Sequence, residues 1–158
     1  MKAILCTIFA QNYKISGLTD FSFLPQPRIG YTHPMNQIIA IAVGGATGAL
    51  LRFWVSGWVY AQMGRGFPYG TLVVNVLGSL LMGFLYVWLI ERTALSPEWR
   101  AALLVGLLGA FTTFSTFSIE SIALIESGEL AKAMLNVLLS VILCIAAAWV
   151  GMIAGRQL

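Results

Sequence analysis

Charged side chains are scarce in this sequence. Only 9% of its 158 residues are Asp, Glu, Lys or Arg, and 59% are hydrophobic. Soluble domains carry about 25% charged residues, so this composition indicates a membrane protein that is embedded in the lipid bilayer. The formal net charge of +3 comes without any basic run, which gives no support for a nucleic-acid partner.

Residues that bind metals or carry out catalysis are also few. The chain has one histidine, His33, and two cysteines, Cys6 and Cys144, which lie in unlike surroundings and suggest no disulfide framework. The sequence contains no HExxH, CxxC, Walker or GxGxxG motif. We therefore expect that the protein is not an enzyme.

Four long apolar runs fill most of the chain, at about residues 36–60, 71–90, 100–125 and 131–154. Each is long enough for a helix that crosses a hydrocarbon core of about 30 Å. Short joints rich in Gly, Pro and charge separate the runs. Because lipid leaves no partner for unpaired backbone groups, the sequence predicts an all-α membrane protein with four transmembrane helices.

The first 34 residues differ from the rest. Their start resembles a secretory signal, but its apolar core has only about seven residues and no convincing cleavage site follows. Met35 directly precedes the first apolar run. We interpret residues 1–34 as an extension without an assigned function, which a start codon assigned too early would explain, and residues 35–158 as the transmembrane domain.

Small residues recur at every fourth position in the first and last runs. Gly44 and Gly48 form a GxxxG motif, and Ala147, Gly151 and Gly155 repeat the spacing. This pattern lets helix backbones approach closely, and packing is the interpretation that we favour. Four spans are too few to enclose a sizeable pathway, so self-association is expected.

Polar residues inside the predicted spans are candidate site residues, because lipid penalises them unless they find partners. Asn75 either makes an interhelical hydrogen bond or presents its amide to an anion. Arg52 either extends to the membrane surface or provides positive potential at an entrance. Asn136, Ser140 and Cys144 follow at i, i+4 and i+8 on one helix face, which predicts a helix contact or a row of donors.

The third run contains the segment GAFTTFSTFSIE, in which hydroxyls alternate with aromatic rings. Phe111, Phe114 and Phe117 recur at i+3, a spacing more typical of packing than of a site. Gly109 and the neighbouring threonines favour a break in the helix at mid-span, which would release backbone groups for ions. Phenylalanine ring edges are weakly positive, so two facing edges could hold a small anion.

Three segments, GGATGALLRFW, PYGTLVVNVLGSLLMGF and GLLGAFTTFSTFSIE, closely resemble the CrcB/Fluc fluoride channels. The resemblance extends from Met35 to the C-terminus. It implies a four-helix subunit with a broken third helix, an antiparallel dual-topology homodimer with two fluoride pores, and passive export of fluoride across the bacterial inner membrane. Such export would lower the toxicity of fluoride in the cytoplasm.

The resemblance also implies roles for individual residues. Backbone carbonyls of Gly109 and Thr112 would hold a structural sodium ion. The positions that match the fluoride pore are Asn75, Phe114, Ser115, Thr116, Phe117 and Ser140. Arg52 and Glu120 match residues at the pore entrance. Ala110, Asn136 and Cys144 depart from the family, which often has glycine, tyrosine and serine at these positions.

The sequence leaves two other functions to consider. A small proton-coupled exporter of cationic drugs also has four spans, but it needs a carboxylate in its first span, and the only charged residue of this one is Arg52. A non-conducting assembly subunit would have no use for Asn75 and the hydroxyl-rich third span, but only a measurement of ion flux would exclude it.

The basic residues at the ends of the spans show little asymmetry. Counted from Met35, one side has Arg92, Arg100 and Arg156, and the other has Arg65 and Lys132. Because orientation follows the Lys/Arg difference between the two sides, a near balance predicts insertion in both orientations. An antiparallel homodimer requires such dual insertion. The alternative is a parallel dimer with one weakly preferred orientation.

Overall fold

The computed structural model describes residues 35–92 and 95–157. The elements in chain order are α2 (Met35–Met63), α3 (Tyr69–Tyr86), the π-helix η2 (Val87–Arg92), α4 (Pro97–Arg100), the π-helix η3 (Ala101–Leu108), α5 (Gly109–Phe111), α6 (Phe114–Glu126) and α7 (Leu130–Gln157). The interpretation of residues 1–34 concerns a segment outside these residues.

The helices form four membrane-spanning segments. The stretches long and apolar enough to cross a membrane are Met35–Met63, Tyr69–Ile90, Pro97–Glu126 and Leu130–Gln157. The four predicted spans are therefore confirmed. The first, third and fourth extend beyond both predicted ends, and the second begins two residues earlier than predicted and ends at residue 90 as predicted. The chain is a multi-pass membrane protein.

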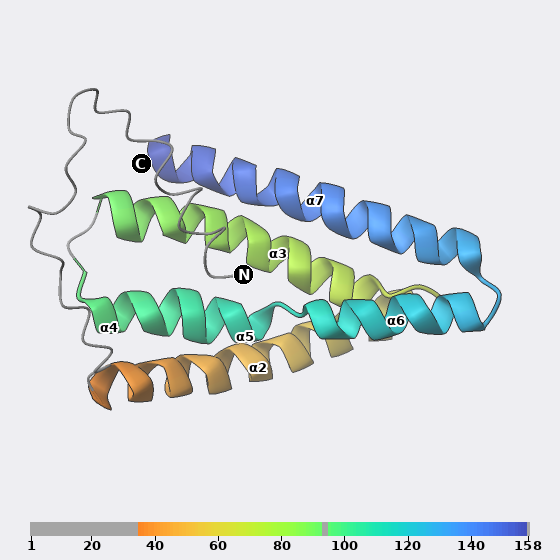
Figure 1. Cartoon of the computed structure of the whole chain (residues 1–158), viewed down its shortest axis with the longest axis horizontal. Helices are drawn as coiled ribbons and strands as arrows, with labels where there is room; N and C mark the ends of the chain where they lie inside the picture. The colour runs from red at the N-terminus through yellow and green to blue at the C-terminus, as the bar shows by residue number, and fades with distance from the viewer. Residues whose placement is uncertain (1–34, 93–94, 158) are drawn as a thin grey trace, which may run out of the picture. The chain divides into compact units, whose positions relative to one another are not determined.

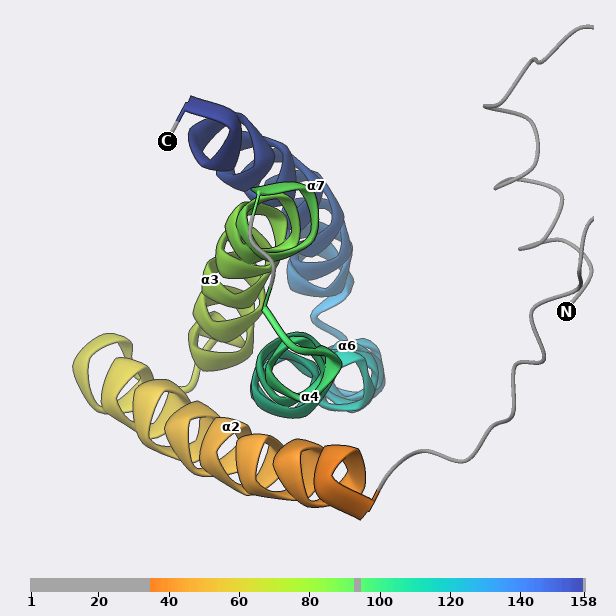
Figure 2. The ribbon, with the colours of Figure 1, turned by 90° about the vertical axis from the view of Figure 1, so that its left-hand side faces the viewer.

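The four segments run side by side, and successive segments point in opposite directions (Figure 1). Helix α3 packs along α7, and α2 packs along η3. The third span consists of α4, η3, α5 and α6 in succession along one line. It is interrupted between α5 and α6 (Figure 1). Figure 2 shows the same arrangement along the helices, with α3 between α7 and the α4 end of this span.

Glycines make the close helix contacts. A Cβ on Gly48 would overlap the carbonyl oxygen of Leu107 in η3, and one on Gly151 would overlap that of Leu80 in α3. Gly44 and Gly155 also meet backbone atoms of neighbouring helices. The packing interpretation of both small-residue patterns is confirmed.

The outer helices leave most of their apolar surface uncovered. In the membrane-spanning windows of α2 and α7, only 11% of residues are buried within the subunit. Large side chains such as Phe53, Trp58 and Trp149 are more than three-fifths exposed. Lipid or another protein must cover these faces, because a patch of this size is unstable in water.

We expect Gly48→Ala to destabilise the subunit by about 1–3 kcal/mol, because the added methyl group pushes α2 away from η3. The measurement is the midpoint of thermal unfolding in detergent. Gly57→Ala on the same helix is the control, since a Cβ there meets nothing within 4 Å. Equal midpoints for both variants would contradict the proposed packing.

Candidate functional site

The candidate site is centred on the interruption of the third span. Helix α5 ends at Phe111, and the next two residues are extended: Thr112 has φ −79° and ψ 157°, and Thr113 has φ −150° and ψ 111°. Thr113 caps α6, because its Oγ1 accepts a hydrogen bond from the Thr116 N–H at 3.2 Å. Gly109 is helical, so the chain leaves the helix at the threonines.

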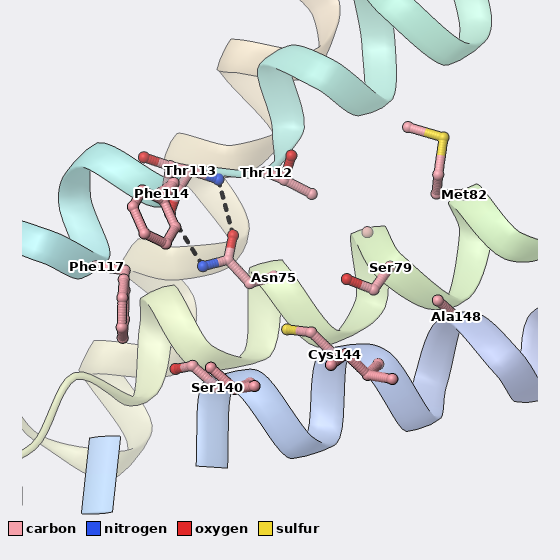
Figure 3. A pocket seen from close by; sticks show the side chains of 13 residues that line it. Asn75, Ser79, Met82, Thr112, Thr113, Phe114, Phe117, Ser140, Cys144 and Ala148 are labelled. Carbon is pink, nitrogen blue, oxygen red and sulfur yellow. Dashed lines mark hydrogen bonds between the residues drawn. The ribbon is translucent and has the colours of Figure 1, made fainter. Parts of the chain in front are cut away.

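Asn75 of α3 binds both backbone groups of Thr113. Its Oδ1 accepts a hydrogen bond from the Thr113 N–H at 2.7 Å, and its Nδ2 donates one to the Thr113 carbonyl at 3.0 Å (Figure 3). Asn75 therefore makes interhelical hydrogen bonds, one of the two alternatives that its sequence position allows. An amide nitrogen carries two N–H groups, so a second donor remains on Nδ2.

The interruption withdraws the usual hydrogen-bond donors from two carbonyls. In a continuous helix the N–H of residue i donates to the carbonyl of residue i−4. The Thr113 N–H instead donates to Asn75, and the Thr116 N–H donates to the Thr113 hydroxyl. Gly109 and Thr112, the two residues expected to supply carbonyls to sodium, are the ones that lose these donors.

A groove of about 490 Å³ lies beside the interruption. Its polar lining comes from three spans and consists of Asn75, Ser79, Thr112, Thr113, Ser140 and Cys144. Phe114 and Phe117 also line it, with ring centroids 5.3 Å apart and planes inclined by 45° (Figure 3). Phe117 is buried, whereas Phe114 is 78% exposed, so this ring projects from the subunit.

The polar stripe of the fourth span is in part hydrogen-bonded along its own helix, since Ser140 Oγ donates to Asn136 Oδ1 at 3.5 Å. Ser140 and Cys144 line the groove. Asn136 is 1% exposed, and its Nδ2 donates to Ser121 Oγ at 2.9 Å. Ser121 in turn donates to the carbonyl of Phe117 at 2.8 Å. Asn136 therefore makes a helix contact that supports the segment carrying Phe117.

The structure separates the other predicted pore residues from the groove. Ser115 and Thr116 are not among the residues that line it. The Thr116 hydroxyl accepts a hydrogen bond from Thr113 Oγ1 at 2.9 Å, so it supports the cap of α6. Thr113 lines the groove but was not a candidate from the sequence. The sequence signal that could have identified Thr113 is its position between two candidate residues, Thr112 and Phe114.

Glu120 lies apart from the groove in a second polar cluster. Its Oε1 accepts hydrogen bonds from the Tyr60 hydroxyl at 2.8 Å and from Thr71 Oγ1 at 3.0 Å. It lines cavities of about 360 and 250 Å³. Arg65 lines both cavities and Arg52 lines neither, so Arg65 is the cation near Glu120.

Comparison with known proteins identifies the family. The model of the family described as CrcB-like protein, Camphor Resistance (CrcB) matches residues 39–152, which include the groove and the Glu120 cluster. The chain belongs to the CrcB family.

Curated CrcB relatives align with most of the chain. A protein of Coxiella burnetii (strain Dugway 5J108-111) is 52% identical over 123 residues, which are 77% of this chain and 99% of the relative. One from Geobacter metallireducens is 49% identical over 78% of this chain and 100% of the relative. One from Methylococcus capsulatus is 64% identical over 77% of this chain, but the match spans only 54% of that longer protein. All three are named fluoride-specific ion channel FluC.

We expect Asn75→Asp to destabilise this CrcB protein by about 2 kcal/mol. The carboxylate cannot donate to the Thr113 carbonyl, and it places one of its oxygens next to that carbonyl oxygen in a part-buried contact. The measurement is the midpoint of thermal unfolding. Asn36→Asp in the exposed first turn of α2 is the control, and it should be neutral or stabilising. An unchanged midpoint for Asn75→Asp would show that this contact contributes little.

Proposed function

We propose that this CrcB-family chain is a subunit of a fluoride channel, which lets fluoride leave the bacterial cytoplasm passively through the inner membrane and lowers its toxicity. The observation that carries the proposal is the match to relatives named fluoride-specific ion channel along 99% and 100% of their length. The activity is conduction and not catalysis.

The chemistry of the groove supports a small anion as the permeant ion. Ser79 offers a hydroxyl, and Asn75 has an N–H beyond the one that Thr113 uses. Ser140 also lines the groove, although its hydroxyl donates to Asn136 Oδ1 at 3.5 Å. None of the described residues that line the groove is charged. The edges of Phe114 and Phe117 add a weak positive potential. Such a lining replaces part of the hydration shell without holding the ion too tightly to leave.

The groove and the exposed Phe114 ring also support assembly with a second copy. A ring that is 78% exposed beside an open groove would gain contacts from a partner surface of the same chain. We infer an antiparallel homodimer, with the interruption of the third span at mid-membrane. The proton-coupled drug exporter is not favoured, because the relatives are named as channels and α2 carries no carboxylate.

We further infer a structural sodium ion held by the carbonyls of Gly109 and Thr112. Both carbonyls lose the donor that a continuous helix would provide, so they suit a hard cation, which prefers oxygen ligands. Among the described residues, no group of three or more His, Cys, Asp or Glu is arranged to bind a metal. The ion would stabilise the interrupted backbone and would not travel with fluoride.

The experiment that tests the function is fluoride efflux from liposomes that contain the purified full chain, followed with a fluoride electrode. Efflux should require valinomycin and potassium to dissipate the membrane potential, because fluoride moves alone as an anion. Chloride-loaded liposomes are the control. Efflux no faster than from protein-free liposomes would overturn the proposed function, and obligatory movement of sodium would overturn the structural role of that ion.

We expect Phe114→Ile to lower fluoride efflux about tenfold or more, because isoleucine keeps the bulk but lacks the ring edge; tenfold corresponds to about 1.4 kcal/mol. The subunit should fold normally, since the ring is mostly exposed within it, and isoleucine keeps an apolar side chain for the partner surface. Phe84→Ile is the matched control, because that ring stacks on Trp88 outside the groove. Wild-type efflux in Phe114→Ile would reduce this ring to a packing role.

We expect the chain that starts at Met35 to insert in both orientations. Reporters active in the cytoplasm or in the periplasm, fused to its C-terminus, should both give signal because the basic residues are nearly balanced. The full sequence adds Lys2, Lys14 and Arg28 to the side with more basic residues, so it should favour that side in the cytoplasm. Signal from only one reporter in the Met35 form would contradict dual topology.

A further inference from the structure

Tyr60 contacts two opposite charges at the Glu120 cluster. Its hydroxyl donates to Glu120 Oε1 at 2.8 Å. The Arg65 guanidinium lies over its ring, with Cζ 5.8 Å from the ring centroid. One side chain thus binds the carboxylate with its polar end and the cation with its aromatic face, which attracts cations through the ring quadrupole.

The side chain of Tyr60 is held in one position. A Cβ on Gly70 would lie 2.5 Å from Cε2 of the ring, so the ring packs directly against the glycine at the start of α3. Thr71, the next residue, donates to the same carboxylate oxygen as Tyr60, at 3.0 Å. The two hydroxyls therefore fix one oxygen of Glu120 from two neighbouring helices.

Arg65 and Glu120 share their surroundings without forming an ion pair. Both line the cavities of about 360 and 250 Å³. In the part of the chain that the structure describes, no ion pair within 4.0 Å joins them. Arg65 is exposed in the loop between α2 and α3, so its guanidinium faces solvent as well as the two cavities.

We propose that Tyr60 is a positioning residue that keeps the Glu120 carboxylate away from Arg65, so that the guanidinium remains available to attract small anions to this end of the subunit. An unpaired cation beside a cavity raises the local concentration of anions, and pairing with a carboxylate would cancel this field. The inference rests on the proposed function, since fluoride is the anion that would benefit. Thr71 acts with Tyr60 as the second tether of the carboxylate.

The test is fluoride efflux from liposomes containing the full chain with Tyr60→Phe. This variant keeps the ring against Gly70 and below Arg65, and it removes only the hydroxyl. We expect efflux to fall about three- to tenfold at an ionic strength of about 10 mM. In about 1 M potassium glutamate the rate should equal that of the wild type, because the Debye length is then about 3 Å. Tyr86→Phe, an exposed tyrosine of α3, is the matched control and should have no effect.

A mutant cycle separates this role from a merely structural one. Arg65→Gln should lower efflux at low ionic strength to the same extent, and the double variant should be no slower than Arg65→Gln alone. Thr71→Val, which removes the second tether at nearly constant volume, should behave like Tyr60→Phe.

Each contrary result overturns the inference. Efflux at the wild-type rate in Arg65→Gln or in Tyr60→Phe at low ionic strength would contradict it. A loss of efflux that persists at high salt would also contradict it. So would a double variant in which the two losses of efflux multiply. Residue 65 lies on an exposed loop, so Arg65→Gln should assemble normally. It therefore tests the inference even if Tyr60→Phe fails to assemble. A wild-type protein without efflux would overturn the proposed function itself, whereas wild-type efflux with unaffected variants overturns only the role of Tyr60.

Discussion

Two hydrogen bonds between Asn75 and the backbone of Thr113 are the contact on which the rest of the site depends. A helix that breaks inside a membrane protein exposes backbone groups, and each group left unpaired in a lipid-like environment costs several kcal/mol. One amide side chain satisfies both groups of Thr113, and the Thr113 hydroxyl then caps the next helix. The extended pair of threonines can persist because these partners come from α3 and from α6 itself.

The small residues of the neighbouring helices make this short contact possible. An asparagine side chain reaches across only a narrow gap, so its helix must lie close to the interrupted one. Gly78, one turn after Asn75, provides this approach, because a Cβ there would overlap Thr112. Where α3 meets α7, Gly83 and Gly151 have the same effect. The result is a groove lined by the short polar side chains of Ser79, Ser140 and Cys144.

The sequence predicts the spans well because their signal is local: long apolar runs and short polar joints decide where helices cross the membrane. The glycine contacts follow from spacing along one helix. The environment of Asn136 could not be predicted in this way, since its position on a shared face with Ser140 does not reveal that Ser121 of another helix supplies its partner. In the sequence Arg65 is only a loop charge, because its position over Tyr60 depends on how the loop folds back onto α2.

The distribution of charge distinguishes the groove from its surroundings. The described residues that line the groove provide hydroxyls, an amide and ring edges but no charge, whereas Glu120 and Arg65 both line two other cavities. A fixed cation in a narrow groove would bind an anion strongly and slow its release, and a carboxylate would repel it. Charge can act at the entrance, where it raises the local concentration of anions and water still screens it. Neutral donors then suffice further along the pathway, provided that enough of them replace the lost water. On this argument the proposed attraction of anions by Arg65 before entry and the weak coordination in the neutral groove after it solve one problem in two parts.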